Sequence, residues 1–461
     1  MSMDNSVRHR SSPSVDCTNV DKQPLAVSTI RVRQDRHEER SIFLDALTHG
    51  LTNGLTNGLG HGQSHGLIHG QSRRLVVAML STFPPTQCGL ATFATATLES
   101  LRKARPAWEF RRIAVADEPL PAADVSTWLK GNDESRNLAV EESNKCDVLL
   151  LQHEFGIFGG PDGSEILGFL RRVRIPVVAV LHTVLTNPTQ DQRRIIAEVA
   201  HRAATVIVMS AEAKRRLVDI YDVTPSKISF IPHGAHPIQF RPPLTTNRRP
   251  VLLTWGLVGP GKGLERAIRA VGQLTERGID VGYRVVGETH PNVRKHQGEQ
   301  YRDSLRQLAI SLGVSDRVFF ESGYRSVHEL GHIILDADIV LTPYCSRDQI
   351  TSGVLSEAIC AGKVVVATAF PHSIEALAHG VGFVVDQDDE AAMADTIENL
   401  VNKPTLTQQT AVRARRSGRT MLWSKVGDAT ADVLANSVVQ SAANFRLPTM
   451  ISAAQPLRIT A

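Results

Sequence analysis

From Arg74 onward, short apolar runs alternate with stretches in which apolar residues recur at helical spacing. Runs such as VVAML and VLLL carry almost no polar residue, which is typical of strands buried on both faces of a sheet. Strands that alternate with amphipathic helices form parallel sheets covered by helices on both sides. The pattern therefore predicts an α/β fold built from doubly wound, Rossmann-like sheets.

The alternation occurs twice, and a stretch rich in proline separates the two halves. In the first half, strands are expected at 75–81, 111–116, 147–152, 176–181, 205–209 and 228–231, with a helix from about Leu90. In the second half, strands are expected at 251–255, 282–286, 318–321, 339–342, 364–367 and 382–385, with helices starting near 264, 299, 327, 353 and 389. This organisation predicts one domain at 74–236, a linker at 237–250 and a second domain at 251–404.

The two ends of the chain differ from this core in composition. Residues 1–73 are polar with little apolar periodicity and are expected to be unstructured. They contain a tetrapeptide repeat of Gly, His and Asn, in which His61, His65 and His69 have the spacing of a metal site on a helix. A glycine after each histidine favours a flexible linker instead. Residues 405–439 are predicted to be helical, and 440–461 are predicted to be loose.

Charge and composition exclude some classes of partner. The net charge of +4 and the aromatic content of 5% do not indicate nucleic-acid binding. No apolar run is long enough to span a membrane and no secretory segment is visible, so a cytoplasmic location is expected. The arginines at 171, 172, 174, 193 and 194 could touch anionic headgroups at the inner face of a membrane. The favoured interpretation of these clusters is solvated helix faces.

Polar residues and glycines follow several strands of the first half. Because the carboxyl ends of parallel strands share one edge of a sheet, these residues are expected to lie at a binding edge. They are Gly89, His153, Glu154, His182, His233 and Gly234, with His236 nearby. A lone histidine at a strand end is more often structural, but His153 and His182 are expected to leave neighbouring strands.

The second half carries two further candidates at strand ends. The segment WGLVGPGKG at 255–263 contains Gly256 and Lys262, a pattern that fits either a phosphate site or ordinary capping chemistry and lacks the P-loop ending. Thr351, Ser352 and Gly353 precede an apolar helical pattern and mark a helix start, where free N–H groups suit a phosphate or sugar oxygen. Glu357 lies one turn further on, where a carboxylate could accept hydrogen bonds from the hydroxyl groups of a ligand.

Other catalytic classes lack their motifs. The sequence has no GxSxG segment for a hydrolase and no GxGxxG segment after the first strand for a dinucleotide enzyme. It has no CxxC pair for a zinc site. No metal ligand is therefore assigned.

Six motifs together resemble retaining glycosyltransferase family 4, over roughly Leu75 to Val439. They are FPPTQCGLATF, IPHG at 231–234, WGLVGPGKG at 255–263, VVGETHP at 285–291, LTPY at 341–344 and SGVLSEAICAGKVVVAT at 352–368. The resemblance implies the GT-B fold, with two facing Rossmann-like domains and a cleft between them. The first domain would take the acceptor, the second would take the nucleotide sugar, and the helices at 405–439 would cross back to the first domain.

The resemblance also implies roles for single residues. Glu357 corresponds to the second glutamate of the family's E-x7-E motif, which holds the ribose, and Lys262 to the lysine that binds the diphosphate. His182 corresponds to the histidine near the sugar's hydroxymethyl group, and these three are the catalytic candidates. The remaining donor-side candidates are Gly256, Gln349, Thr351, Ser352 and Gly353, and those on the acceptor side are Gly89, His153, Glu154, His233 and Gly234.

Two positions depart from the family pattern. Gln349 replaces the first glutamate of the motif, and Leu257 replaces an arginine before the lysine. Arg325, Lys295 and Arg347 are candidates to supply the missing cation. These departures leave two alternatives open, an active transferase and a non-catalytic protein that binds a sugar nucleotide or a glycan, with a GT-B epimerase or phosphorylase a weaker third.

The function implied by the resemblance is transfer of a hexose of mannose or glucose type from a GDP- or UDP-linked donor, with retention at the anomeric carbon. The acceptor hydroxyl would belong to a glycan, a lipid or a small molecule. The donor is a co-substrate, and neither a cofactor nor a metal is expected.

Overall fold

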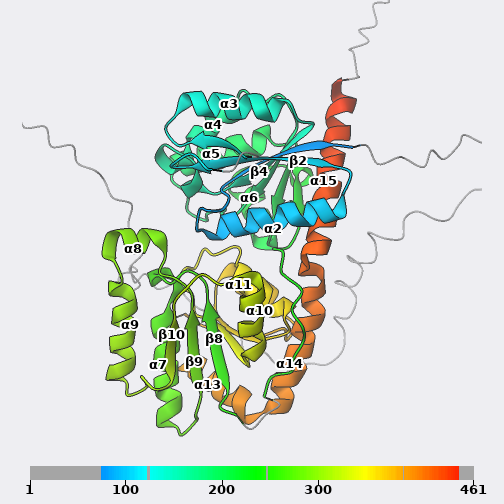
Figure 1. Ribbon diagram of the computed structural model, residues 1–461. Helices are drawn as coiled ribbons and strands as arrows, with labels where there is room; N and C mark the ends of the chain where they lie inside the picture. The colour runs from blue at the N-terminus through cyan, green and yellow to red at the C-terminus, as the bar shows by residue number, and fades with distance from the viewer. Residues whose placement is uncertain (1–73, 122–124, 245–247, 388, 446–461) are drawn as a thin grey trace, which may run out of the picture. The chain divides into compact units, whose positions relative to one another are not determined.

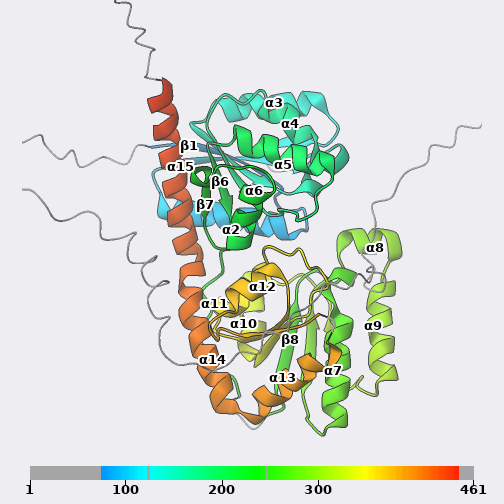
Figure 2. The same cartoon turned by 180° about the vertical axis from the view of Figure 1, so that it is seen from behind.

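The computed structural model describes residues 74–121, 125–244, 248–387 and 389–445. The segment 1–73 with its repeat, and residues 446–461, lie outside the described part. Within it the chain forms two parallel sheets, each layered between helices, as expected from the sequence (Figure 1, Figure 2).

The first sheet has the strand order β3-β2-β1-β4-β5-β6-β7, and all its pairings are parallel. Its strands are β1 (Val76–Ser81), β2 (Glu109–Ala116), β3 (Val125–Leu129), β4 (Val148–His153), β5 (Val177–Leu181), β6 (Thr205–Val208) and β7 (Ile228–Phe230). Successive residues of β1 point to opposite faces: Ala78 and Leu80 join one core, and Val77 and Met79 join the other. This two-sided burial explains why the central strands are apolar throughout.

Helices cover both faces of this sheet. One face is covered by α3 (Asp133–Asn144), α4 (Glu165–Leu170), α5 (Gln190–Arg202) and α6 (Ala211–Asp219). The opposite face is covered by α2 (Gly89–Ala104) and by α15 (Trp423–Phe445), which belongs to the end of the chain (Figure 1).

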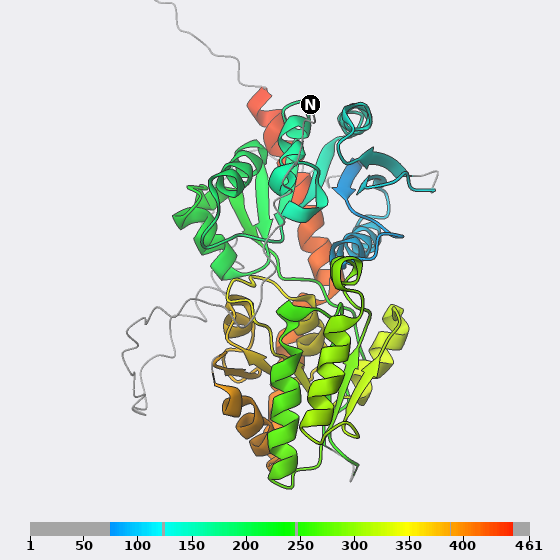
Figure 3. The same ribbon diagram turned by 90° about the vertical axis from the view of Figure 1, so that its left-hand side faces the viewer.

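The second sheet has the order β10-β9-β8-β11-β12-β13, again all parallel. Its strands are β8 (Val251–Trp255), β9 (Gly282–Val286), β10 (Val318–Glu321), β11 (Ile339–Thr342), β12 (Val364–Thr368) and β13 (Phe383–Val385). One face packs on α7 (Leu264–Glu276), α9 (Gln300–Ser311) and α13 (Glu390–Asn402), and the other on α10 (Val327–Asp336) and α11 (Gly353–Cys360) (Figure 3). The remaining helices are α8 (Pro291–Gln297), α12 (Pro371–Ala376) and α14 (Pro404–Ser417).

The last helix belongs to the first sheet in packing although it comes last in sequence. Trp423, at the start of α15, is buried in the same core as Leu75 and Met79. Beside it, the backbone at Ala235 pairs with Leu422. The expected return of the C-terminal helices to the first domain is therefore present.

Several elements were missed or misjudged from the sequence. The edge strand β3 and helix α3 were not expected, because VSTWL is short and mixed in polarity and α3 is strongly polar. Helix α15 continues to Phe445, so the prediction of a loose segment was wrong for residues 440–445. Leu434 and Val438 are the last positions of this helix in the core of the first sheet.

The crossing of α15 over α2 supplies a test of this packing. A Cβ at Gly427 would lie 2.8 Å from both the Cβ and the backbone oxygen of Ser100 on α2. We expect Gly427→Leu to separate the two helices and to lower the free energy of unfolding by about 1–3 kcal/mol, as overpacking does. Denaturant unfolding would measure the change. Asn436→Leu, at an exposed position of the same helix, is the matched control, and equal stability of the two variants would contradict the prediction.

Candidate active site

The start of α11 is the best-defined polar feature of the second sheet. Ser352 is the N-cap, and its Oγ accepts a hydrogen bond from the Leu355 amide at 3.3 Å. The hydroxyl of Tyr344 lies 3.3 Å from the same oxygen. The capping geometry expected from the sequence is therefore present, and it is fixed from a neighbouring strand end.

Lys262 lies beside this helix start. It ends a short turn after β8, and its Nζ is 4.2 Å from the centre of the Tyr344 ring. Gly263 makes the approach possible, since its φ is +60° and a Cβ there would lie 2.0 Å from the Pro343 carbonyl oxygen. Tyr344 thus contacts both a cation and a helix N-terminus, and these two groups together are suited to bind an anion.

Gly353 brings the helix start against His233. A Cβ on Gly353 would lie 3.0 Å from Cε1 and 3.1 Å from Nε2 of that histidine. The Nδ1 of His233 is 2.7 Å from the Gly234 carbonyl, which can only accept, so Nδ1 carries the proton and Nε2 is an acceptor. Burial lowers the pKa of His233, which keeps the ring neutral.

Glu357, one turn into α11, is paired with a histidine from the segment after β7. Its Oε1 accepts a hydrogen bond from Nδ1 of His236 at 2.8 Å, and both side chains are partly exposed. The sequence placed His236 near this region but did not indicate the pairing. No hydrogen bond within the described part of the chain engages Glu357 Oε2.

Gln349 and Thr351 lie in the loop before α11 and bond to each other. The Gln349 side-chain amide donates to the Thr351 carbonyl oxygen at 2.6 Å. This bond depends on Gln349 being a donor, which the glutamate of the usual motif is not. Gly256, the other glycine among the donor-side candidates, directly follows β8, and its N–H donates to the Val286 carbonyl at 3.0 Å.

His153 and His182 leave neighbouring strands, as expected. The His182 amide donates to the His153 carbonyl at 3.1 Å, and β4 and β5 are paired in parallel. Nε2 of His182 lies 2.7 Å from Gln152 Oε1. Burial, aided by the charge of nearby His233 and His153, lowers the pKa of His182 to about 3.

His153 itself is fully buried, and neither ring nitrogen has a partner among the described residues. Burial lowers its pKa to about 4. The Ser81 Oγ and Gln152 Nε2 at the same strand ends are also buried, again with no hydrogen-bond partner in the described part of the chain. This group of unsatisfied polar atoms marks a polar interior at the edge of the first sheet, where buried polar atoms normally find partners.

Glu154 and Gly89 have local structural explanations. Glu154 accepts hydrogen bonds from the Phe155 amide at 2.9 Å and the Thr183 hydroxyl at 2.6 Å, and burial raises its pKa. Gly89 is the first residue of α2, and an added Cβ there would meet no atom within 4 Å. Packing therefore does not require a glycine at position 89.

Aromatic contacts join the histidines of the two strand-end groups. The ring of Phe93 on α2 lies 4.8 Å from His182 and 4.9 Å from His233, measured between ring centres. Trp423 lies 5.2 Å from Phe93 in the same way, and a Cβ on Gly234 would lie 2.3 Å from the Trp423 ring. His182, His233 and Gly234 are thus held around one aromatic pair.

Three residues outside the predicted set bond to this region. His372 accepts a hydrogen bond from the Ser352 amide at 2.8 Å. Asp348 accepts from the Thr186 hydroxyl at 2.5 Å and lies 3.0 Å from Arg216, and Glu375 accepts from the Ala211 amide. His372 and Glu375 follow β12 closely. They could therefore have been found by the same signal as His153 and His182, a polar residue just after the carboxyl end of a parallel strand.

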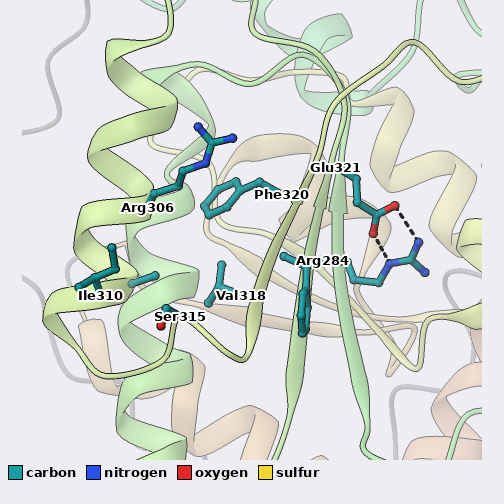
Figure 4. A pocket seen from close by; sticks show the side chains of 9 residues that line it. Arg284, Arg306, Ile310, Ser315, Val318, Phe320 and Glu321 are labelled. Carbon is teal, nitrogen blue, oxygen red and sulfur yellow. Dashed lines mark hydrogen bonds and ion pairs between the residues drawn. The ribbon is translucent and has the colours of Figure 1, made fainter.

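The cavity shown in Figure 4 lies elsewhere. It has a volume of about 600 Å³ and is lined by residues of β10 and α9 together with Arg284 and Ser315. Arg284 forms two hydrogen bonds with Glu321 there, at 2.6 and 3.0 Å. None of the candidate residues lines this cavity.

Among the described residues, no group of three or more His, Cys, Asp or Glu side chains is arranged to hold a metal ion. No described helix combines the length and apolarity needed to cross a bilayer. Arg325, one candidate for the missing cation, donates to the Ser322 carbonyl of its own turn at 3.1 Å.

Comparison with known proteins identifies the class. The family model "Glycosyl transferases group 1" matches residues 237–419, and "Glycosyltransferase Family 4" matches residues 117–237. D-inositol 3-phosphate glycosyltransferases are relatives: that of Frankia alni is 28% identical over 57% of this chain and 69% of its own length. That of Stackebrandtia nassauensis is 30% identical over 54% of this chain and 58% of its own length.

Solved structures show the same fold. Anabaena HepE in complex with UDP superimposes with a TM-score of 0.63 at 18% identity, covering 78% of this chain and 99% of that chain. Sucrose-phosphate synthase from Thermosynechococcus elongatus gives a TM-score of 0.58 at 16% identity, covering 81% and 98%. The protein therefore has the GT-B fold of glycosyltransferases. Within that class the chain belongs to glycosyltransferase family 4, as the motif resemblance indicated.

The neutral histidines generate a prediction about acid stability. Because the pKa of His153 is about 4 in the folded chain and about 6.5 when unfolded, the unfolded chain binds the extra proton between these values. Stability is therefore fully retained above pH 6.5 and falls as the pH decreases toward 4. As the pH is lowered from 6.5 to 5.5, the free energy of unfolding should fall by about 1 kcal/mol less in His153→Gln than in the parent. Denaturant unfolding at the two pH values would measure this difference.

The control for this experiment is His201→Gln, at an exposed position of α5. It should leave the pH dependence close to that of the parent. An unchanged pH dependence in His153→Gln would show that His153 is not held neutral by burial.

Proposed function

We propose that this protein is a retaining glycosyltransferase that moves a hexose of mannose or glucose type from a GDP- or UDP-linked donor to an acceptor hydroxyl. The observation that carries the proposal is the junction at Tyr344, where the Lys262 ammonium lies beside the N-terminus of α11. Glu357 stands on the same helix. A diphosphate and a ribose need these three groups within reach of one another.

Each group has a chemical task in the transfer. The charge that builds on the diphosphate as the glycosidic bond breaks would be stabilised by Lys262 and by the positive end of α11. Glu357 would accept hydrogen bonds from the ribose hydroxyl groups through Oε2, since His236 already bonds to Oε1. His236 would thereby hold the carboxylate in one orientation.

Retention follows from the order of bond changes that we propose. The acceptor oxygen would bond to the anomeric carbon on the face that the diphosphate leaves, and a phosphate oxygen would take the acceptor's proton. No protein nucleophile and no metal is required in this route. The neutral His182 would contact sugar hydroxyls rather than provide charge, because its pKa is about 3.

The relatives support this proposal in general terms. Those named above are D-inositol 3-phosphate glycosyltransferases, and the neighbouring HepE structures contain UDP and UDP-glucose. We propose a glycan, a lipid or a small molecule as the acceptor class. The proposal keeps the cytoplasmic location expected from the sequence, with peripheral membrane contact through the arginines near 171 and 193 as an option.

One observation favours a second candidate, a non-catalytic protein that binds a sugar nucleotide. Leu257 stands where the family has an arginine, and Gln349 stands where it has a glutamate. Both changes remove a charge from the donor side. The bond from Gln349 to Thr351 argues against simple loss of function, because the glutamine has a defined structural partner.

Donor turnover tests the main proposal. With a panel of GDP- and UDP-linked hexoses and mixed acceptors, we expect the parent to release GDP or UDP. Lys262→Ala and Glu357→Ala should reduce kcat/KM by roughly 100-fold or more, because each removes a charged contact to the donor. Lys103→Ala and Glu276→Ala, at exposed positions, are the matched controls. Donor binding without any release by the parent would favour the non-catalytic candidate.

Gln349 offers a test that separates the two candidates. In Gln349→Glu the carboxylate would face the Thr351 carbonyl oxygen, and the hydrogen bond between the two residues would be lost because a carboxylate cannot donate. We expect the free energy of unfolding of this variant to be about 1–3 kcal/mol lower than that of the parent, and its turnover of the nucleotide sugar to be slower. Gln349→Ala, which removes the bond without adding a charge, should be the milder change. Turnover by Gln349→Glu in the absence of any turnover by the parent would indicate that the parent is a binding protein.

A further inference from the structure

His372 has an unusual environment for a histidine close to a helix start. It follows β12 in the short helix α12, and its side chain is only 4% exposed. The Ser352 amide, at the N-cap of α11, donates to its Nδ1 at 2.8 Å. The backbone donor that the sequence assigned to the ligand is therefore occupied by an imidazole.

The position of the ring proton follows from this hydrogen bond. Since Nδ1 accepts, it carries no proton, and burial lowers the pKa of His372 to about 3. The ring is thus neutral with its hydrogen on Nε2. Within the described residues, no hydrogen bond engages that Nε2–H, although the side chain is nearly enclosed.

His233 and His372 both contact the start of α11. His233 packs on Gly353 and presents an acceptor at Nε2, whereas His372 bonds to Ser352 and presents a donor. Ser352 and Gly353 are consecutive residues, so both rings lie at the first positions of α11. A ligand at this helix start therefore meets one donor and one acceptor, both uncharged.

We propose that the Nε2–H of His372 binds a phosphate oxygen of the nucleotide-sugar donor and carries the polarity of the α11 N-terminus to that oxygen. The Ser352 amide withdraws electron density from the ring through Nδ1, which strengthens the opposite N–H as a donor. A strengthened donor beside a lysine and a helix start favours an anion over a hydroxyl. This inference rests on the proposed donor site.

Two substitutions separate this role from a purely structural one. Asparagine can place its side-chain oxygen near the position of Nδ1 and keep the bond to Ser352, but it has no donor at the position of Nε2. Glutamine reaches the position of Nε2 with its amide but leaves the Ser352 amide without an acceptor. His372→Asn thus removes the proposed ligand contact, and His372→Gln removes the internal one.

The test is equilibrium binding of UDP and GDP to the full-length protein, by calorimetry, with Tm measured for every variant. We expect His372→Asn to keep its Tm within a few degrees and to weaken binding of the nucleotide that the parent prefers by roughly tenfold or more. We expect His372→Gln to lower Tm while weakening binding less. Binding by His372→Asn equal to that of the parent, with His372→Gln the weaker binder, would overturn the proposal in favour of a structural role.

Two comparisons keep this proposal distinct from the proposed function. If Lys262→Ala weakens UDP or GDP binding and His372→Asn does not, the donor site stands and the role of His372 fails. If His372→Asn weakens binding of the nucleotide sugar but not of the free nucleotide, the contact is to the sugar and the phosphate assignment is overturned. If the parent binds no nucleotide or nucleotide sugar, the proposed function itself fails.

Discussion

A Cβ would overlap its neighbours at Gly263 and Gly234 and would crowd His233 at Gly353, and the arrangement of the candidate site depends on these three close approaches. Gly263 lets the loop after β8 meet the Pro343 carbonyl, which brings Lys262 to Tyr344. Gly353 lets α11 start against His233, and Gly234 lets the segment after β7 lie on Trp423. Because protein interiors are close-packed, these contacts restrict how far the loop of Lys262, the start of α11 and the segment of His233 can shift.

The electrostatic character of the site follows from burial. Four histidines, at 153, 182, 233 and 372, have lowered pKa values because their rings are removed from water. At neutral pH they provide hydrogen-bond donors and acceptors without charge. Lys262 and the N-terminus of α11 supply positive charge beside them, which suits a ligand with one anionic part and many hydroxyl groups.

Much of the fold and part of the site could be predicted because they depend on local patterns. The strands at 251–255, 282–286 and 318–321 have the predicted bounds, since each is a short apolar run between turn residues. Ser352 was recognised as an N-cap from its neighbours alone, and the N-cap bond is present. In contrast, β3 and α3 were missed because a half-exposed edge strand and a polar helix lack a strong apolar period.

The sequence by itself determined the two parallel sheets, the family and the loops that carry the polar residues, because periodicity and motif spacing are properties of neighbouring residues. Only the tertiary structure decided which polar groups are already engaged. Ser352 gives its amide to His372, Glu357 accepts from His236, and Gln349 is tied to Thr351. The first two of these bonds join residues from different elements of the fold. They therefore depend on the order of the strands in the sheets and on how closely the connecting segments pack, which no local pattern records.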